Sequence, residues 1–292
     1  MSEVAILTPA ERRRRAVAVP LFVVHALVLV GLAVAGLGPL LWLVAASLGE
    51  TGDVLADPLG VFARMTEWQH YVDAFRGVDT ARLLGNTLVL AAGSAAVTVV
   101  VALSAGYVIA IMRPRWAPIF SAAVLATIFL PAIVSFVPLY LTVVDLFGTG
   151  ISLQNTYWAV WLPAAANAFA VLLVTGFLRG LPRELIEAAQ IDGAGPLRIM
   201  WSVVLPLARP ILGVVALLAA IGAWKDYLWP SLVLTDPKLR PISVALPMLE
   251  RTNELTTFFA NLVVAAVVPI ALFLVFQRPL LANAGFSAGM KD

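Results

Sequence analysis

The sequence predicts an all-α polytopic membrane protein with six transmembrane helices. Hydrophobic residues make up 61% of the chain, charged residues 12%, and the mean hydropathy is +0.96. Soluble domains contain about 45–50% apolar and about 25% charged residues. The apolar residues also fall into six runs of about 20–30 residues, each long enough to cross a bilayer.

The first predicted span covers residues 16 to about 48, after a polar tail at 1–15 that ends in four arginines. This run is about twice the length of a signal-peptide core of about 7–15 residues, so we expect a retained membrane helix. A mixed-charge loop follows and ends at 82, so that the first helix and its external loop together occupy 16–82. Trp68, Tyr71 and Phe75 share one face of a short interfacial helix in that loop.

The next two spans are predicted at 83–112 and 118–147. In the first of them Ala102, Gly106 and Ala110 recur every four residues, a spacing that allows close contact between helices. Pro131 and Pro138 interrupt the other span, and kinks of this kind suit a helix that lines a cavity.

The remaining spans are predicted at 157–178, 211–234 and 258–280, so that 83–281 forms the transmembrane core and 282–292 a tail. Twelve basic residues next to the spans fall on one side and six on the other. The positive-inside rule therefore predicts that both termini and the loop at 182–206 are cytoplasmic. The loops at 50–82 and 236–257 are expected to face outward.

The polar loop at 182–206 is predicted to form two short helices and a turn. Pro182 suits a helix start, with Glu184 near the positive end of the helix dipole. Gly193 ends that helix and Pro196 begins the next one. Each piece is about 15 Å long, too short to cross a bilayer. An ordinary amphipathic loop is the alternative.

The spacing of Glu187-Ala188-Ala189, Gly193 and 203–206 resembles the EAA loop of ABC (ATP-binding-cassette) importer permeases. In that family the loop is a coupling helix that inserts into a groove on the ATPase subunit. The resemblance implies that coupling residues lie throughout the loop. They are Glu184, Glu187, Ala188, Ala189, Asp192, Gly193, Leu205 and Pro206.

The segment 224–236 resembles the W-N-[DE]-F-L-W-P signature of carbohydrate-type ABC permeases, specifically the maltose-type second permease subunit. Lys225 stands where Asn is usual, and Tyr227 where Phe is usual. Aromatic faces stack on sugar rings, but such residues also anchor helices at the membrane interface. With a polar residue of the fourth span added, the candidate path residues are Asn167, Trp224, Asp226, Tyr227 and Trp229.

Two smaller features extend the family resemblance. Residues 68–87 follow its pattern ahead of the second span, and 289–292 resembles a tail that touches the ATPase in some members. Asp145 is expected to have an ordinary interfacial role, and Asn167 equally fits a hydrogen bond between helices.

The resemblance implies one permease subunit of an ATP-driven, binding-protein-dependent sugar importer in the bacterial inner membrane. The implied partners are a sister permease, a dimer of ATP-binding subunits, an extracytoplasmic sugar-binding protein and membrane lipid. No P-loop occurs in the sequence, so ATP and Mg²⁺ are expected on the partner ATPase and no cofactor on this chain. A net charge of +2, with no basic patch, argues against nucleic acid.

Three alternatives stay open at this point. An ABC permease for a non-sugar solute shares the loop but not the 224–230 signature. A secondary transporter would leave the loop unexplained and would need buried carboxylates, for which Asp145 and Asp226 are the sparse candidates. A membrane enzyme is disfavoured because the chain has no cysteine and only the separate His25 and His70, so no catalytic or metal-ligating residue is expected.

Overall fold

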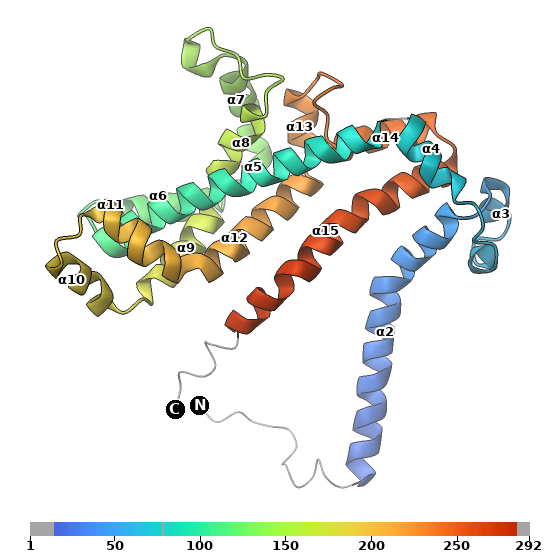
Figure 1. Cartoon of the computed structure of the whole chain (residues 1–292), viewed down its shortest axis with the longest axis horizontal. Helices are drawn as coiled ribbons and strands as arrows, with labels where there is room; N and C mark the ends of the chain where they lie inside the picture. Colours follow the sequence, from blue (N-terminus) through green and yellow to red (C-terminus); the bar gives the residue numbers. More distant parts are fainter. Residues whose placement is uncertain (1–14, 78, 285–292) are drawn as a thin grey trace. The chain divides into compact units, whose positions relative to one another are not determined.

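The computed structural model describes residues 15–77 and 79–284 (Figure 1). These residues form α-helices joined by short 3₁₀ and π segments, and no strand occurs among them. The predicted all-α class is therefore confirmed. The predicted tail at 1–15, except Arg15, and the 285–292 part of the C-terminal tail, including the motif at 289–292, lie outside the described residues.

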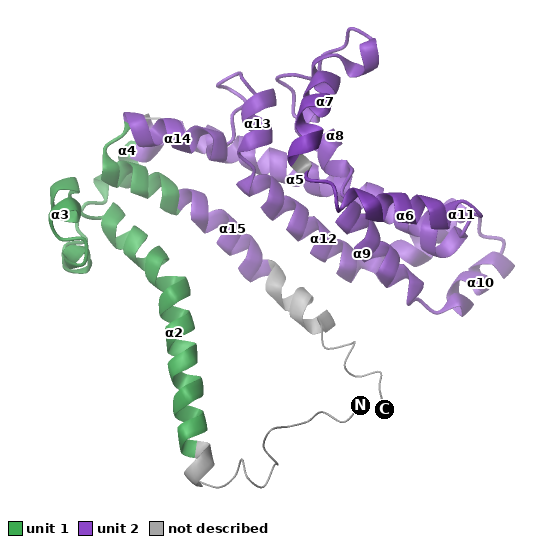
Figure 2. Ribbon diagram, turned by 180° about the vertical axis from the view of Figure 1, so that it is seen from behind, with its two compact units in different colours: residues 1–73, 253–263 green, residues 74–252, 264–292 purple. Residues whose placement is uncertain are grey.

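The chain divides into two compact units (Figure 2): residues 1–73 with 253–263, and residues 74–252 with 264–292. The division that the sequence predicts, into a tail at 1–15, a first helix with its loop at 16–82, a transmembrane core at 83–281 and a tail at 282–292, stays a prediction.

Unit 1 contains the first long apolar helix and the short elements that follow it. The elements are α2 (Arg15–Ser47), α3 (Thr51–Ala56), η1 (Gly60–Ala63), most of α4 (Gln69–Gly77) and the start of α15 (Leu255–Ala284). Trp42 and Phe259 meet edge to face with ring centroids 5.7 Å apart. His70 lies between the carbonyl of Ser47, 3.0 Å from Nδ1, and the hydroxyl of Thr256, 3.2 Å from Nε2. His70 therefore holds unit 1 together by hydrogen bonds.

Unit 2 contains the remaining helices. In order they are α5 (Thr80–Tyr107), η2 (Val108–Met112), α6 (Ala117–Thr127), α7 (Ala132–Val144), η3 (Leu146–Gly148), α8 (Trp158–Ala165), α9 (Ala168–Arg179), α10 (Arg183–Ile191), α11 (Pro196–Ile199), η4 (Met200–Val204), α12 (Leu205–Lys225), α13 (Leu228–Val233) and α14 (Ile242–Thr252).

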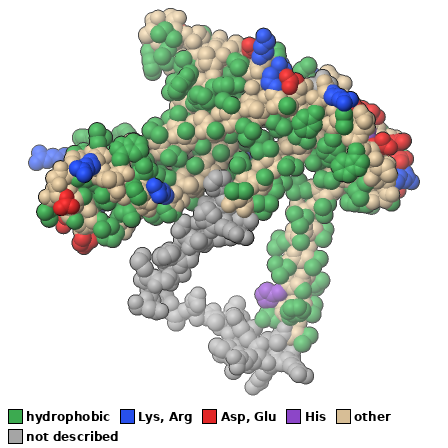
Figure 3. Space-filling view, viewed as in Figure 1, with side chains coloured by type: hydrophobic (Ala, Val, Ile, Leu, Met, Phe, Trp, Pro, Cys, Tyr) green, Lys and Arg blue, Asp and Glu red, His purple; other side chains and the backbone are tan. Residues whose placement is uncertain are grey.

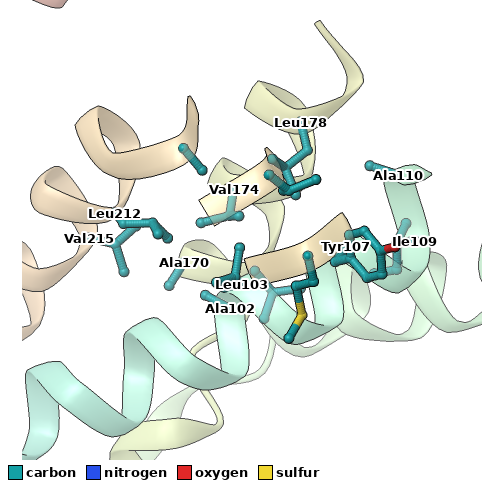
Figure 4. Close-up of a cluster of buried hydrophobic side chains, with 14 of the residues drawn as sticks. Ala102, Leu103, Tyr107, Ile109, Ala110, Ala170, Val174, Leu178, Leu212 and Val215 are labelled. Atoms are coloured by element: carbon teal, nitrogen blue, oxygen red, sulfur yellow. The ribbon is translucent and has the colours of Figure 1, made fainter. Parts of the chain in front are cut away.

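The main core of unit 2 lies where α5, α9 and α12 meet, and their side chains point toward one another in Figure 4. The predicted small-residue face, which runs along α5 and into η2, is part of this core: Ala102 and Ala110 are each only 1% exposed. A Cβ added at Gly106 would lie 3.0 Å from Val174 of α9. The small side chains therefore let α5 and α9 approach closely, as the sequence spacing predicts.

Four helices of the described chain are long and apolar enough to cross a membrane: Val19–Ser47, Thr80–Met112, Pro196–Lys225 and Leu255–Val275. The pair α8 and α9, bent by 45° at Ala166 and Asn167, makes a fifth span if the two count as one. The predicted span at 118–147 is two shorter apolar helices, α6 and α7. Pro131 accounts for this break, because the proline ring clashes with the preceding residue, Leu130, and disfavours the helical conformation there.

The sequence-based prediction of a separate second helix in the 182–206 loop is wrong. Residues Pro196–Lys225 form one continuous helix of 30 residues, and the predicted start of the fifth span at 211 lies inside it. A π-turn carries the helix up to Pro206, with the Leu205 N–H bonded to the Met200 carbonyl five residues back. Pro206 and Pro210 are thus accommodated within the continuous helix.

One prediction concerns the contact between α5 and α8. A Cβ at Gly93 would overlap the indole ring of Trp161, whereas a Cβ at Gly85, in the same helix, meets nothing within 4 Å. We expect Gly93→Ala to destabilise the protein by about 1–3 kcal/mol through overpacking. Gly85→Ala should be neutral or stabilising by up to about 1 kcal/mol. Thermal unfolding of the two purified variants tests this, and equal midpoints would contradict it.

Candidate coupling loop and substrate cavity

The first half of the loop is a nine-residue helix, α10, as predicted. Glu184, Glu187 and Ala188 are exposed on it, and Ala189 is half-buried. Exposed carboxylates beside a small alanine leave room for a partner surface to approach. The side chains of the predicted coupling residues on α10 are therefore largely accessible.

A tight turn closes α10 at Asp192 and Gly193. The Gly193 N–H donates to the Gln190 carbonyl at 3.0 Å, and the Ala194 N–H donates to the Ala189 carbonyl at 2.9 Å. Gly193 has a φ of +76°, in the left-handed region that favours glycine. The turn reverses the chain before Pro196 and depends on the residue at 193.

The apolar side chains in the second half of the loop lie in two different environments. Met200 and Val204 are buried in the unit 2 core, whereas Leu197 is 71% and Trp201 57% exposed. At the end of α10, Ile191 is 86% exposed. Large apolar side chains exposed on an otherwise polar loop are typical of a surface that binds another protein.

The last two predicted coupling residues belong to the continuous helix. Leu205 is half-buried against the unit 2 core and Pro206 is exposed. The structure therefore places them at the base of the loop, where it joins the rest of the continuous helix.

A cavity of about 410 Å³ lies within unit 2, between helices that are far apart in the sequence. We call it the polar cavity, because hydroxyl, amide and carboxylate groups share its wall with aromatic and aliphatic side chains. Its lining residues are Ser94, Thr98, Phe136, Leu139, Val160, Pro163, Ala164, Asn167, Leu218, Ala219, Gly222, Ala223, Asp226 and Trp229.

Three of the five predicted path residues line the polar cavity: Asn167, Asp226 and Trp229. The other two do not. Trp224 is 4% exposed and donates its indole N–H to the Ala265 carbonyl at 3.1 Å, so it packs α12 against α15. Tyr227 is 47% exposed and lies outside the lining.

Asp226 and Asn167 each sit at the start of a short helix. The Asp226 carboxylate accepts from the Trp229 N–H at 3.4 Å, and the Asn167 side-chain oxygen accepts from the Ala170 N–H at 2.9 Å. The Asn167 bond caps α9, and the Asp226 bond satisfies a backbone N–H in the first turn of α13, so both side chains are held in place. The Asn167 bond uses only the oxygen and leaves the amide donors, and Asp226 keeps a second carboxylate oxygen.

The sequence analysis missed Ser94, Thr98 and Phe136. Thr98 donates to the Ala164 carbonyl at 3.0 Å, whereas the buried Ser94 hydroxyl has no hydrogen-bond partner in the described structure. Phe136 lies 6.0 Å from Trp229 between ring centroids and extends the aromatic wall. The available signal was the spacing of Ser94 and Thr98, two hydroxyls one turn apart in an apolar span.

Asp145 and Lys225 stand apart from the polar cavity. Asp145 accepts from the Gly150 N–H at 2.8 Å and closes a surface turn. Lys225 is exposed and, like Asp226, forms no ion pair with any side chain that the structure describes; the ion pairs among those side chains are Arg64–Asp53 and Arg82–Asp79. The same part of the chain contains no group of three His, Asp or Glu side chains that could hold a metal ion.

These features define a class: a helical membrane protein with an internal polar cavity and a loop, 182–206, that exposes apolar and acidic side chains to a binding partner. Residues 98–281, more than half of the chain, match the family described as "Binding-protein-dependent transport system inner membrane component". The chain belongs to this family. It is therefore a multi-pass membrane transport subunit, an ABC permease and not an enzyme, and its family implies a partner ATPase and a substrate-binding protein.

Three similar proteins span nearly the whole chain. The sn-glycerol-3-phosphate transport system permease protein UgpE of Brucella suis biovar 1 (strain 1330) is 28% identical over 87% of this chain and 92% of its own. The melibiose/raffinose/stachyose import permease protein MelC of Bacillus subtilis (strain 168) is 29% identical over 86% and 90%. A chain from the crystal structure of a bacterial ABC transporter that imports the acidic polysaccharide alginate has the same fold, with a TM-score of 0.79, 22% identity and coverage of 90% and 97%.

Proposed function

We propose that this chain is a permease subunit of an importer for a neutral sugar. The polar cavity carries the proposal. Ser94, Asn167 and Asp226 offer hydrogen-bonding groups for hydroxyls, and the Trp229 and Phe136 rings offer faces for the apolar side of a sugar ring.

The charge of the polar cavity favours a neutral sugar over an anionic solute. Asp226 is the only charged side chain among the described residues that line it. A carboxylate repels a phosphate or a uronate, and binding such an anion requires a cation that this wall does not supply. The melibiose-type permease is therefore a closer functional analogue than the glycerol-3-phosphate or alginate transporters.

The loop at 182–206 is the proposed contact with the ATPase. Exposed Glu184, Glu187 and Asp192 share the loop with the exposed apolar Ile191, a combination suited to a groove with basic edges. In this proposal a sister permease completes the path, a dimer of ATP-binding subunits holds ATP and Mg²⁺, and a sugar-binding protein docks on the other side.

Uptake by cells tests the choice of solute. A strain lacking this permease, and the same strain with the gene restored, are given radiolabelled melibiose, maltose and sn-glycerol-3-phosphate in separate assays. Restoration of uptake of at least one neutral sugar, with no change in glycerol-3-phosphate uptake, is the expected result. Restoration of glycerol-3-phosphate uptake alone would overturn the proposal.

The proposed orientation places both termini and the 182–206 loop in the cytoplasm. The chain has no native cysteine, so all labelling of a single-cysteine variant comes from the introduced residue. Leu59 and Met248, 80% and 58% exposed, belong to the predicted outer loops, and Ile191, 86% exposed, belongs to the inner one. We expect an impermeant thiol reagent to label Leu59→Cys and Met248→Cys in intact cells and Ile191→Cys only in opened cells. The reverse pattern would invert the orientation.

A further inference from the structure

We propose that unit 2 holds the headgroup of an anionic phospholipid in a basic pocket beside the 182–206 loop. The pocket, of about 190 Å³, lies where η2, α9 and α10 come together. Arg113, Arg179 and Arg183 supply its basic side chains, and we call these three residues with their surroundings the basic pocket. Figure 3 shows basic side chains at this end of unit 2, over α10 and α11.

The charge of the basic pocket is not balanced within the described chain. Glu187 is the single carboxylate of its lining, against three guanidinium groups. The ion pairs in the described residues join Arg64 to Asp53 and Arg82 to Asp79, so none of the three pocket arginines is paired. Like charges gathered in one hollow repel each other, and a bound anion removes this repulsion.

The backbone at Arg113 holds its side chain in the basic pocket at a conformational cost. Arg113 has φ +49° and ψ +51°, in the left-handed region that a residue with a Cβ seldom adopts. Its Nε donates to the Ala110 carbonyl at 2.6 Å, which leaves the terminal N–H groups of the guanidinium for another acceptor. This left-handed cap ends η2 ahead of Pro114, with the Arg113 N–H bonded to the Val108 carbonyl at 3.0 Å, so the backbone cap and the Nε bond together fix the side chain at the pocket wall.

A second hollow adjoins the basic pocket and identifies the ligand as an amphiphile. Its volume is about 360 Å³, and it shares Arg113 and Arg179 with the basic pocket. The rest of its wall is apolar, from Ile109, Pro114, Ala117 and Pro118. A free phosphate would fill only the basic pocket, whereas a phospholipid would place its phosphate there and an acyl chain along the apolar wall.

The position along the chain is that of a membrane interface. Arg113 directly follows the Thr80–Met112 span, and Arg179 is the last residue of α9. Next to Arg113 and Arg115, Trp116 is 54% and Ile119 76% exposed. Tryptophan and arginine at the end of a span are the residues that contact lipid headgroups, and basic pockets between such helices bind anionic ones.

Lipid titration of the purified full-length chain tests the proposal. The thermal unfolding midpoint is measured in non-ionic detergent micelles that contain increasing phosphatidylglycerol or, separately, phosphatidylcholine. We expect phosphatidylglycerol alone to raise the midpoint. Arg113→Gln and Arg179→Gln should each shift the half-maximal phosphatidylglycerol concentration upward about fivefold, and the double variant about 25-fold.

Two further variants separate this site from general charge effects. Arg209→Gln removes an exposed arginine of α12 that lines neither hollow, and it should titrate like the wild type. Arg113→Lys/Arg179→Lys keeps the charge and should recover most of the response. If the double Gln variant does not fold, the two single variants provide the same comparison.

Two results would overturn the proposal. The first is a phosphatidylglycerol response that is equal in the wild type, the Arg113 and Arg179 variants and Arg209→Gln. The second is an Arg113-dependent shift produced equally by millimolar inorganic phosphate, which would identify a soluble anion as the ligand. Native mass spectrometry, with phosphatidylglycerol retained by the wild type and lost from the double Gln variant, would support a bound lipid directly.

Discussion

Gly193→Pro is expected to abolish solute uptake while the chain still inserts into the membrane. Proline fixes φ near −65°, but Gly193 has a φ of +76°. Proline also removes the N–H that donates to the Gln190 carbonyl at 3.0 Å. Because Gly193 lies at the exposed tip of the loop, the loss should affect the shape of the loop and not the unit 2 core. Uptake and membrane-fraction immunoblotting measure the two effects separately.

A matched pair of alanine variants isolates the role of the backbone angle. An added Cβ meets nothing within 4 Å at either Gly193 or Gly195, but only Gly193 has a positive φ. Gly193→Ala should therefore strain the turn by about 1–2 kcal/mol and reduce uptake, whereas Gly195→Ala should leave it close to wild type. Full uptake by a normally expressed Gly193→Pro variant would remove the turn from the coupling mechanism.

Asp226→Asn is expected to weaken apparent sugar affinity about tenfold in a complex that assembles normally. Asparagine retains the size of the side chain and an acceptor oxygen, so the bond from the Trp229 N–H in the first turn of α13 should survive. The substitution removes the negative charge that strengthens hydrogen bonds from sugar hydroxyls. The concentration dependence of uptake gives the affinity, and co-purification of the partner subunits reports assembly.

Asp145→Asn provides the control for Asp226→Asn. It removes a carboxylate charge from the same unit at a surface turn, where the side chain accepts from the Gly150 N–H. This variant should transport with unchanged apparent affinity. Failed assembly of Asp226→Asn would instead assign Asp226 to balancing a cation on another subunit. Normal assembly with unaltered transport would remove Asp226 from the sugar path.

The parts of the fold that depend on local sequence were predictable. Gly193 marks the end of α10 because a left-handed turn needs glycine, and the spacing of Ala102, Gly106 and Ala110 marks the face that packs on α9. In both cases the physical requirement acts on one residue or on one helix face. A single sequence displays such requirements directly.

The parts that depend on which helices meet were not predictable. Trp224 and Trp229 belong to one signature, yet Trp224 packs against α15 and Trp229 lines the polar cavity. Ser94 reaches the polar cavity from α5, more than a hundred residues before Asp226. The directions of these side chains follow from a break in the helix at Asp226 and from tertiary packing, and no local pattern encodes either.

The uninterrupted helix Pro196–Lys225 has a mechanical consequence. At 1.5 Å per residue it is a rod of about 45 Å, with one end in the loop at 182–206. The last turns of the rod, through Leu218, Ala219, Gly222 and Ala223, form part of the wall of the polar cavity. A helix resists compression along its axis, so in the proposed coupling a push at Pro196 would move that wall. The π-turn at Met200–Val204 is the place where the helix could bend instead. In this proposal a conformational change of the ATPase at one membrane face would alter the shape of the polar cavity through a single helix.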